Sequence, residues 1–155
     1  MGLDMYLTAE KPIFKVWGNE QPTQEQKDME YIEKSLFKDI QNKGFKLNRT
    51  IRLDIMYWRK ANAIHAFFVD NCADGVDDCE KMYVEQENLV KLKDLCEQVL
   101  KDNSLASKLL PSQSGLFFGL TDYDENYFQD IQDTFDVLQK AITLEDVDFY
   151  YRASW

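Results

Sequence analysis

The sequence contains a single histidine, His65, among 155 residues. Catalytic zinc sites usually take several histidine ligands, and a serine or cysteine nucleophile needs a nearby base. With one histidine, a zinc enzyme is disfavoured, and His65 is the one histidine that could act as such a base. The sequence also lacks the GxSxG nucleophile elbow and the GxxxxGK[ST] phosphate-binding loop. We therefore assign no catalytic residue, metal ligand or cofactor, and we favour a binding protein over an enzyme.

Cysteines are also few, and their spacing is uninformative for metal binding. Cys72, Cys79 and Cys96 form an odd set without a CxxC pair. This pattern argues against a disulfide framework and against a structural zinc site. The N-terminal segment MGLDMYLTAEKP lacks a basic stretch followed by an apolar run, and no run approaches the length of a membrane span. We expect a cytoplasmic protein that does not enter a membrane.

Positive charge is scarce, and the formal net charge is −10. Nine carboxylates lie between Asp122 and Asp148, against the single basic residue Lys140. Because such a surface repels phosphate backbones, we do not expect direct binding to nucleic acids or to anionic membranes. Two interpretations of the acidity remain: a generally acidic soluble protein, which we favour, or a decoy that presents carboxylates to a nucleic-acid-binding partner.

Apolar residues, in contrast, make up 45% of the chain and aromatic residues 14%, which predicts a folded globule. We expect one domain spanning residues 1–155. Alternating apolar residues predict strands over residues 3–8, 50–58, 82–84 and 148–155. Helical spacing predicts helices over residues 20–40, 61–71, 85–100 and 127–142, and a short helix ends near Leu110. The predicted fold class is α+β: a small mixed or antiparallel sheet of about four strands, covered by three or four helices.

The stretch YWRKANAIHAFFVDN, from Tyr57 to Asn71, contains the strongest candidate site, at the junction of a strand and a helix. If the helix begins at Arg59, the side chains of Trp58, Asn62 and His65 share one face. Helix N-termini bind anions, and arginine supplies a fork for phosphate or carboxylate. Trp58 could stack on a base or a cation. We name Trp58, Arg59, Lys60, Asn62 and His65 as candidate ligand-binding residues.

A structural interpretation of the same residues stays open. Arg59 and Lys60 would then pair with the acidic C-terminal third, and the backbone would satisfy Asn62 and His65. The segment PSQSG and the following tyrosine would supply a second wall of the site if the two segments meet in space. The candidates there are Gln113, Ser114 and Tyr123.

Two acidic segments invite a metal-binding interpretation. The loop from Asp70 resembles an EF-hand but has Lys81 where the bidentate glutamate belongs, so a solvated acidic turn is the better interpretation. Asp122, Asp124 and Glu125 form the tightest carboxylate cluster beside aromatic residues. Capping of a helix N-terminus by Asp122 or Asp124 explains this cluster better than metal-assisted hydrolysis does.

Several segments together resemble a family of small uncharacterised proteins of bacteriophages, prophages and bacteria. These segments are the opening MGLDMYL, the central YWRKANAIHAFFVDN with GVDDC, the stretch LLPSQSGLFFGLTDYDENYFQDIQDT and the terminal DFYYRASW. The resemblance implies a location in the cytoplasm of a bacterial host cell, but it carries over no catalytic residues. By analogy, such accessory proteins act on host machinery or host defence.

These observations lead to one principal hypothesis and one alternative. The principal hypothesis is a phage or prophage accessory protein that binds a host protein, or sequesters a small anionic, nucleotide-like ligand, and so interferes with host defence. The alternative is a small metal-assisted hydrolase acting on a nucleotide or a related phosphate. It would use His65 or the carboxylates around Asp122 together with a divalent ion.

Overall fold

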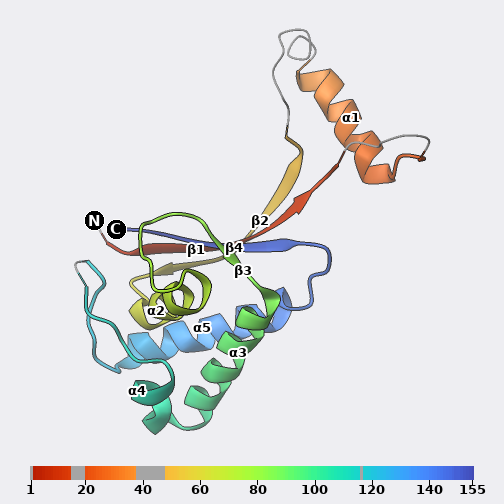
Figure 1. Ribbon diagram of the computed structural model, residues 1–155. Helices are drawn as coiled ribbons and strands as arrows, with labels where there is room; N and C mark the ends of the chain where they lie inside the picture. Colours follow the sequence, from red (N-terminus) through yellow and green to blue (C-terminus); the bar gives the residue numbers. More distant parts are fainter. Residues whose placement is uncertain (1, 15–19, 38–47, 116) are drawn as a thin grey trace. The chain divides into compact units, whose positions relative to one another are not determined.

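The computed structural model describes residues 2–14, 20–37, 48–115 and 117–155 (Figure 1). In these residues the strands form one antiparallel sheet with the order β2-β1-β4-β3. The strands are β1 (Asp4–Pro12), β2 (Thr50–Arg59), β3 (Met82–Val84) and β4 (Asp148–Ser154). The helices are α1 (Gln24–Leu36), α2 (Asn62–Cys72), α3 (Gln86–Lys101), α4 (Ala106–Leu109) and α5 (Glu125–Ala141), with the 3-10 turn η2 (Asn103–Leu105) before α4. The α+β fold predicted from the sequence is confirmed.

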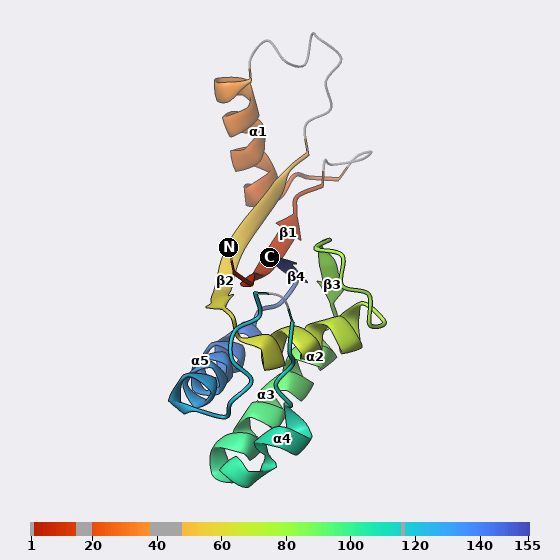
Figure 2. The same ribbon diagram turned by 90° about the vertical axis from the view of Figure 1, so that its left-hand side faces the viewer.

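The described residues group by their contacts into two compact units, and the single domain over residues 1–155 stays a prediction. The larger unit comprises Met1–Ala9 and Leu53–Trp155, and it contains every candidate site residue. The smaller unit comprises Glu10–Arg52 and contains α1. In the larger unit, α2, α3 and α5 lie on the same side of the sheet in both ribbon views (Figures 1 and 2).

The smaller unit is organised around a buried ion pair. Glu33 of α1 is buried, and Arg49 donates from Nε and Nη2 to its two carboxylate oxygens. The spacing of Ile32, Leu36 and Ile40 predicted an apolar face on this helix. Ile32 and Leu36 are instead exposed, and Ile40 lies outside the described residues. A bidentate pair satisfies the buried charge of Glu33, so helical periodicity alone did not identify the buried side of this helix.

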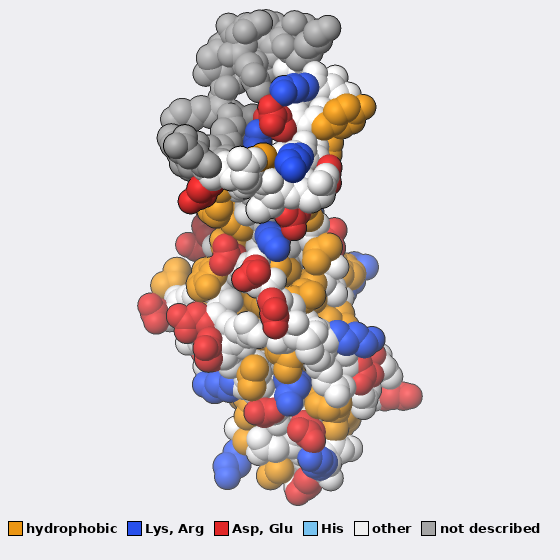
Figure 3. All heavy atoms as spheres, turned by 90° about the vertical axis from the view of Figure 1, so that its right-hand side faces the viewer, with side chains coloured by type: hydrophobic (Ala, Val, Ile, Leu, Met, Phe, Trp, Pro, Cys, Tyr) orange, Lys and Arg blue, Asp and Glu red, His pale blue; other side chains and the backbone are white. Residues whose placement is uncertain are grey.

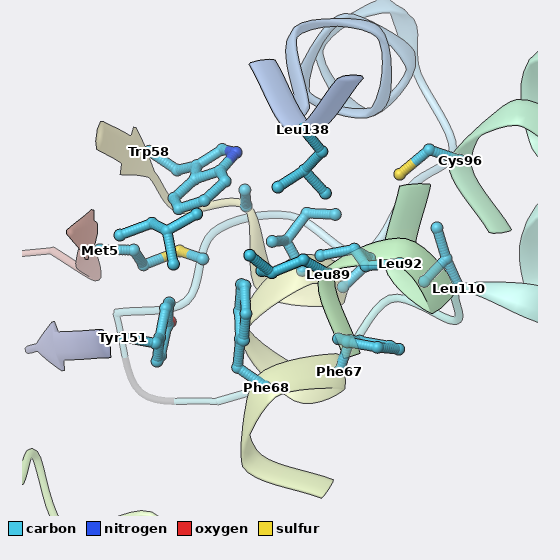
Figure 4. Packing of buried hydrophobic residues seen from close by; sticks show 14 of the residues in the cluster. Met5, Trp58, Phe67, Phe68, Leu89, Leu92, Cys96, Leu110, Leu138 and Tyr151 are labelled. Carbon is cyan, nitrogen blue, oxygen red and sulfur yellow. The ribbon is translucent and has the colours of Figure 1, made fainter. Parts of the chain in front are cut away.

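The core of the larger unit lies between the sheet and its helices. The buried side chains of β1 and β4 alternate along each strand, as expected for an antiparallel sheet with one covered face. The aromatic ring of Tyr151 in β4 stacks on that of Phe68 in α2, with centroids 4.2 Å apart (Figure 4). The α3 residues Leu89, Leu92, Cys96 and Val99, predicted to share one helical face, are all buried. This packing holds the β2–α2 junction in place.

The other face of the sheet carries exposed apolar side chains. Strand β2 forms where the sequence predicted it, but Ile51, Leu53 and Tyr57 are exposed and Trp58 is the buried residue near its end. Tyr6 of β1 contacts Tyr57 with ring centroids 5.3 Å apart. An alternating pattern therefore located the strand without showing which side faces the core.

Burial governs the chemistry of two of the three thiols. All three cysteines are free. Burial raises the pKa of Cys72 to about 11 and that of Cys96 to about 12, so both are protonated at neutral pH. None of the helices within the described ranges combines the length and the apolar composition that crossing a bilayer requires.

Candidate ligand-binding site

The backbone turns sharply where β2 ends and α2 begins. Lys60 adopts a left-handed conformation with φ of 63°, and its N–H donates to the carbonyl of Leu3 over 2.8 Å. The N–H of Asn62 then donates to the carbonyl of Lys60, which closes an inverse γ-turn around Ala61 (φ −75°, ψ 68°). The helix thus begins at Asn62, close to the predicted start at residue 61, and the condition for a shared face, a start at Arg59, is not met. Trp58 is a strand residue and does not share a helical face with Asn62.

Two predicted ligand contacts, Trp58 and His65, are instead sealed in the core. Trp58 is 2% exposed, and its indole Nε1 donates to Thr134 Oγ1 over 2.8 Å. His65 is fully buried, with Nδ1 2.7 Å from the hydroxyl of Tyr151 and Nε2 3.0 Å from Oδ2 of Asp77. Because buried polar groups need partners, these bonds identify both side chains as structural residues. The expectation that they face a ligand is corrected.

Asn62 brings the two predicted segments together. Its Nδ2 donates to the carbonyls of Phe118, over 3.3 Å, and Leu120, over 2.8 Å. Its Oδ1 accepts the backbone N–H of Gln113 over 2.9 Å. The side chain is 5% exposed, so these three bonds occupy its polar atoms inside the fold. Asn62 therefore anchors the segment around residues 113–120 to the start of α2.

The other predicted residues of that segment lie beside the site and do not line its pocket. The side chains of Gln113 and Ser114 are exposed. The Tyr123 hydroxyl accepts the N–H of Ser112 over 3.3 Å, and its ring meets that of Tyr127 edge-on at 4.9 Å. The wall that we expected from Gln113, Ser114 and Tyr123 comes instead from the loop before α5 and from the first turns of that helix.

A pocket of about 410 Å³ lies beside the β2–α2 junction, entirely within the larger unit. One part of its lining comes from the junction, namely residues 59–64. The remainder comes from the loop before α5 and from its first two turns: Gly119, Leu120, Asp122, Asp124, Asn126, Tyr127, Gln129, Asp130 and Ile131. Gly119 has φ of 94°, and a Cβ there would come within 3.1 Å of the Lys60 Cβ, so the two walls meet closely at this glycine.

The junction side of the pocket is positive. Neither the Arg59 side chain nor the Lys60 side chain forms a hydrogen bond or an ion pair with another residue that the structure describes. No side chain caps the start of α2, and Ala63 and Ile64, in its first turn, line the pocket. The N–H of Asn62 donates to Lys60, so the helix dipole and the remaining N–H groups of the first turn are what attract negative charge at this terminus. The interpretation that both cations pair with the acidic C-terminal third is thus not supported within the described residues.

The α5 side of the pocket is acidic. Asp124 caps this helix, with Oδ1 accepting the N–H of Tyr127 over 3.0 Å and Oδ2 accepting from Asn126 Nδ2 over 3.2 Å. The predicted N-cap is therefore confirmed at Asp124. Asp130 differs, because its carboxylate has no hydrogen-bond partner among the described residues. Burial, then the negative charges of Asp133 and Asp124, raise the pKa of Asp130 to about 6.

Sequence reasoning missed three residues that define the site and its support. Asp77 lies in the loop interpreted as a solvated turn, yet it pairs with His65. The Thr134 hydroxyl accepts a hydrogen bond from the indole N–H of Trp58 and donates one to the main-chain carbonyl of Asp130 over 2.6 Å. Asp130 itself directly precedes Ile131 of the buried stripe on α5, and this position was the available signal. Within the described residues, no group of three or more histidine, cysteine, aspartate or glutamate side chains is arranged to hold a metal ion.

The fold and the pocket define an α+β protein with a small cleft that is positive on one side and acidic on the other. Comparisons of the chain with protein-family models, with curated protein sequences and with solved structures find no match. The resemblance to small phage and prophage proteins therefore stays a prediction, and the function has to be argued from the pocket.

Proposed function

We propose that the protein binds a small anionic, nucleotide-like ligand in the pocket at the β2–α2 junction, and that it acts by sequestering this ligand. One observation carries the proposal: Arg59 and Lys60 line the pocket without partners among the described residues, beside the uncapped start of α2. Guanidinium, ammonium and helix N–H groups are the donors that hold phosphates in proteins.

Two further features support a binding pocket at this place. Its volume of about 410 Å³ falls in the range of roughly 300–1,000 Å³ that small-molecule sites occupy. Lys60 holds a left-handed backbone that costs a residue with a side chain about 1–2 kcal/mol. Such local strain gathers at ligand sites, where the surrounding structure maintains it.

The proposed setting follows from the resemblance to phage and prophage proteins. In the cytoplasm of a bacterial host, a protein with this pocket would withdraw a nucleotide-like signal from a defence system. Sequestration needs tight binding and no turnover. It therefore suits a chain with a single histidine that is fully buried.

The proposal is tested by Arg59→Ala in calorimetric titrations with a panel of nucleotides. We expect at least tenfold weaker binding, because charge-assisted hydrogen bonds contribute about 1.5–3 kcal/mol. The matched control is Arg152→Ala, which removes the same charge from an exposed position on β4. Wild-type protein that binds no nucleotide, or equal affinity of the Arg59 variant, would overturn the proposal.

The alternative of a metal-assisted hydrolase receives less support. His65 is sealed between Tyr151 and Asp77. Both carboxylate oxygens of Asp124 accept hydrogen bonds from the first turn of α5. Incubation of the nucleotide panel with the protein, with and without magnesium or manganese, separates the two functions. Binding without turnover supports sequestration, whereas turnover in the presence of the ion establishes the hydrolase.

A host protein is a second candidate partner, because Asp133 and Asp136 are exposed on α5. Acidic, basic and hydrophobic side chains are interspersed on the face drawn in Figure 3, so negative charge forms no continuous patch there. Capture of a basic partner would depend on α5 itself. Reversing the charge with Asp133→Lys and Asp136→Lys should abolish such capture and leave the nucleotide affinity unchanged. The Arg59→Ala variant should behave in the opposite way.

A further inference from the structure

We infer that the ligand is a nucleotide whose base presents two adjacent hydrogen-bond donors, as guanine does, and that Asp130 accepts both. This inference rests on the proposed function and names the ligand class of the same pocket. The phosphate would lie at Arg59 and Lys60, and the base would lie toward α5.

Three aspartates line the pocket: Asp122 is exposed and Asp124 caps α5, which leaves Asp130 as the partly buried carboxylate that is available. Its main-chain carbonyl accepts from Thr134, but its side chain has no partner among the described residues, although the residue is partly buried. Asp124 differs because it caps α5 with both oxygens. The carboxylate oxygens of Asp130 still reach the solvent, so they can accept hydrogen bonds from a ligand that enters the pocket.

The chemistry of an unpaired carboxylate selects its complement. An ionised carboxylate only accepts hydrogen bonds, and its two oxygens can take two parallel N–H groups. The Watson–Crick edge of guanine offers N1–H and the 2-amino group side by side. Adenine offers one N–H donor beside the acceptor nitrogen N1. This nitrogen would face a carboxylate oxygen, which is also an acceptor, so the two would repel each other. A carboxylate at this position thus favours guanine and disfavours adenine.

The rest of the lining fits this orientation. The pocket lining also includes the apolar residues Ile64, Leu120 and Ile131, of which Ile64 and Ile131 are almost completely buried. Leu120 is largely exposed, so it is available to cover a planar base. Binding sites commonly combine apolar walls with a few polar groups that set the orientation of the ligand.

The ionisation of Asp130 adds an independent expectation. Its pKa of about 6 means that the acceptor is ionised at pH 7 and becomes protonated below pH 6. The charged groups around it are Asp124 and Asp133 from the α5 side and Arg59 and Lys60 from the junction. Two N–H donors stabilise the carboxylate, so binding of a guanine nucleotide should weaken as the pH falls from 7 to 5.

The experiment measures the affinities of GMP, IMP and AMP for the wild-type protein, Asp130→Asn and Asp136→Asn. We expect the wild type to prefer GMP over AMP by ten- to a hundredfold, in line with a bidentate contact to a base, with IMP between them. Asp130→Asn should abolish the preference while leaving AMP affinity within about twofold. Asp136→Asn removes the same charge from an exposed position on the same helix and should preserve the preference.

The outcomes separate this inference from the proposed function. If no nucleotide binds the wild type, the proposed function fails. If GMP and AMP bind equally, or if the preference survives in Asp130→Asn, the guanine inference is overturned while the anion site stands. Should the Asp130 variant fold poorly, the pH profiles of the wild type decide. The phosphates of GMP and AMP titrate alike at about pH 6, so GMP affinity that falls no more than AMP affinity between pH 7 and 5 contradicts the inference.

Discussion

Two sets of polar residues lie side by side at the β2–α2 junction and differ in whether the fold supplies their partners. Trp58, Asn62 and His65 are buried, and each has a hydrogen-bond partner inside the protein. Arg59 and Lys60 stand between them, without such partners among the described residues. The comparison shows that one short segment both contributes to the packing of the fold and contains two cations without side-chain partners among the described residues.

The difference arises from the path of the backbone. Along β2 successive side chains alternate between the faces of the sheet, which places Trp58 toward the helices and Arg59 away from that core. The left-handed turn at Lys60 then reorients the chain before α2 begins. Substitutions in the sealed set should therefore reduce stability, whereas substitutions in the unpaired set should change binding.

The largest effect is expected from His65→Ala. The change removes a fully buried ring and leaves the Tyr151 hydroxyl without its 2.7 Å partner. Loss of packing, together with an unsatisfied buried hydroxyl, should lower the free energy of unfolding by about 3–4 kcal/mol. Chemical denaturation followed by circular dichroism measures the loss. A change below about 1 kcal/mol would show that His65 is not part of the sealed set.

Asn62→Ala should have the next largest effect, at about 2–3 kcal/mol, because it removes three hydrogen bonds to the segment around residues 113–120. Hydrogen exchange should show faster exchange of the Gln113 amide, which loses its acceptor. Asn71→Ala is a suitable control, since Asn71 lies on the same helix and is not buried. If the Gln113 amide keeps its protection in the Asn62 variant, Asn62 does not anchor the segment.

Much of the fold could be predicted from periodicity. The pattern of Leu89, Leu92, Cys96 and Val99 located α3 and its buried face, because a helix packed on one side has a single apolar stripe. The same spacing in α1 does not mark a buried face, because Glu33, which pairs with Arg49, is buried whereas Ile32 and Leu36 are exposed. An ion pair between distant residues leaves no periodic signal in the sequence.

The sequence indicated where the candidate site lies, but not which of its polar residues are buried and bonded inside the fold. The concentration of polar residues around Arg59 and Lys60 indicated the junction beside which the pocket lies. Their separation into sealed and unpaired sets depends on contacts over long sequence distances, such as that between Trp58 and Thr134. Asp130 lay within the acidic C-terminal third, where composition suggested only a charged surface. Its burial is set by the packing of α5 against the junction, which composition does not encode.

The smallest effect is expected from Lys60→Gly, which tests the backbone strain in the turn between β2 and α2. Lys60 has φ of 63°, and glycine adopts this conformation without the penalty of about 1–2 kcal/mol that other residues incur. Part of this gain is offset because glycine loses more backbone entropy on folding, by roughly 0.5–1 kcal/mol. Lys60→Gly should therefore raise the free energy of unfolding by about 0.5 kcal/mol while it weakens nucleotide binding.

Lys60→Ala separates strain from the loss of the ammonium group, because alanine keeps the left-handed penalty. It should lose affinity as the glycine variant does, but without any gain in stability. Denaturation of both variants under identical conditions, paired with titrations against one nucleotide, gives the two quantities. Equal stabilities of the glycine and alanine variants would mean that the turn stores no strain, and unchanged affinity in both would remove Lys60 from the binding site.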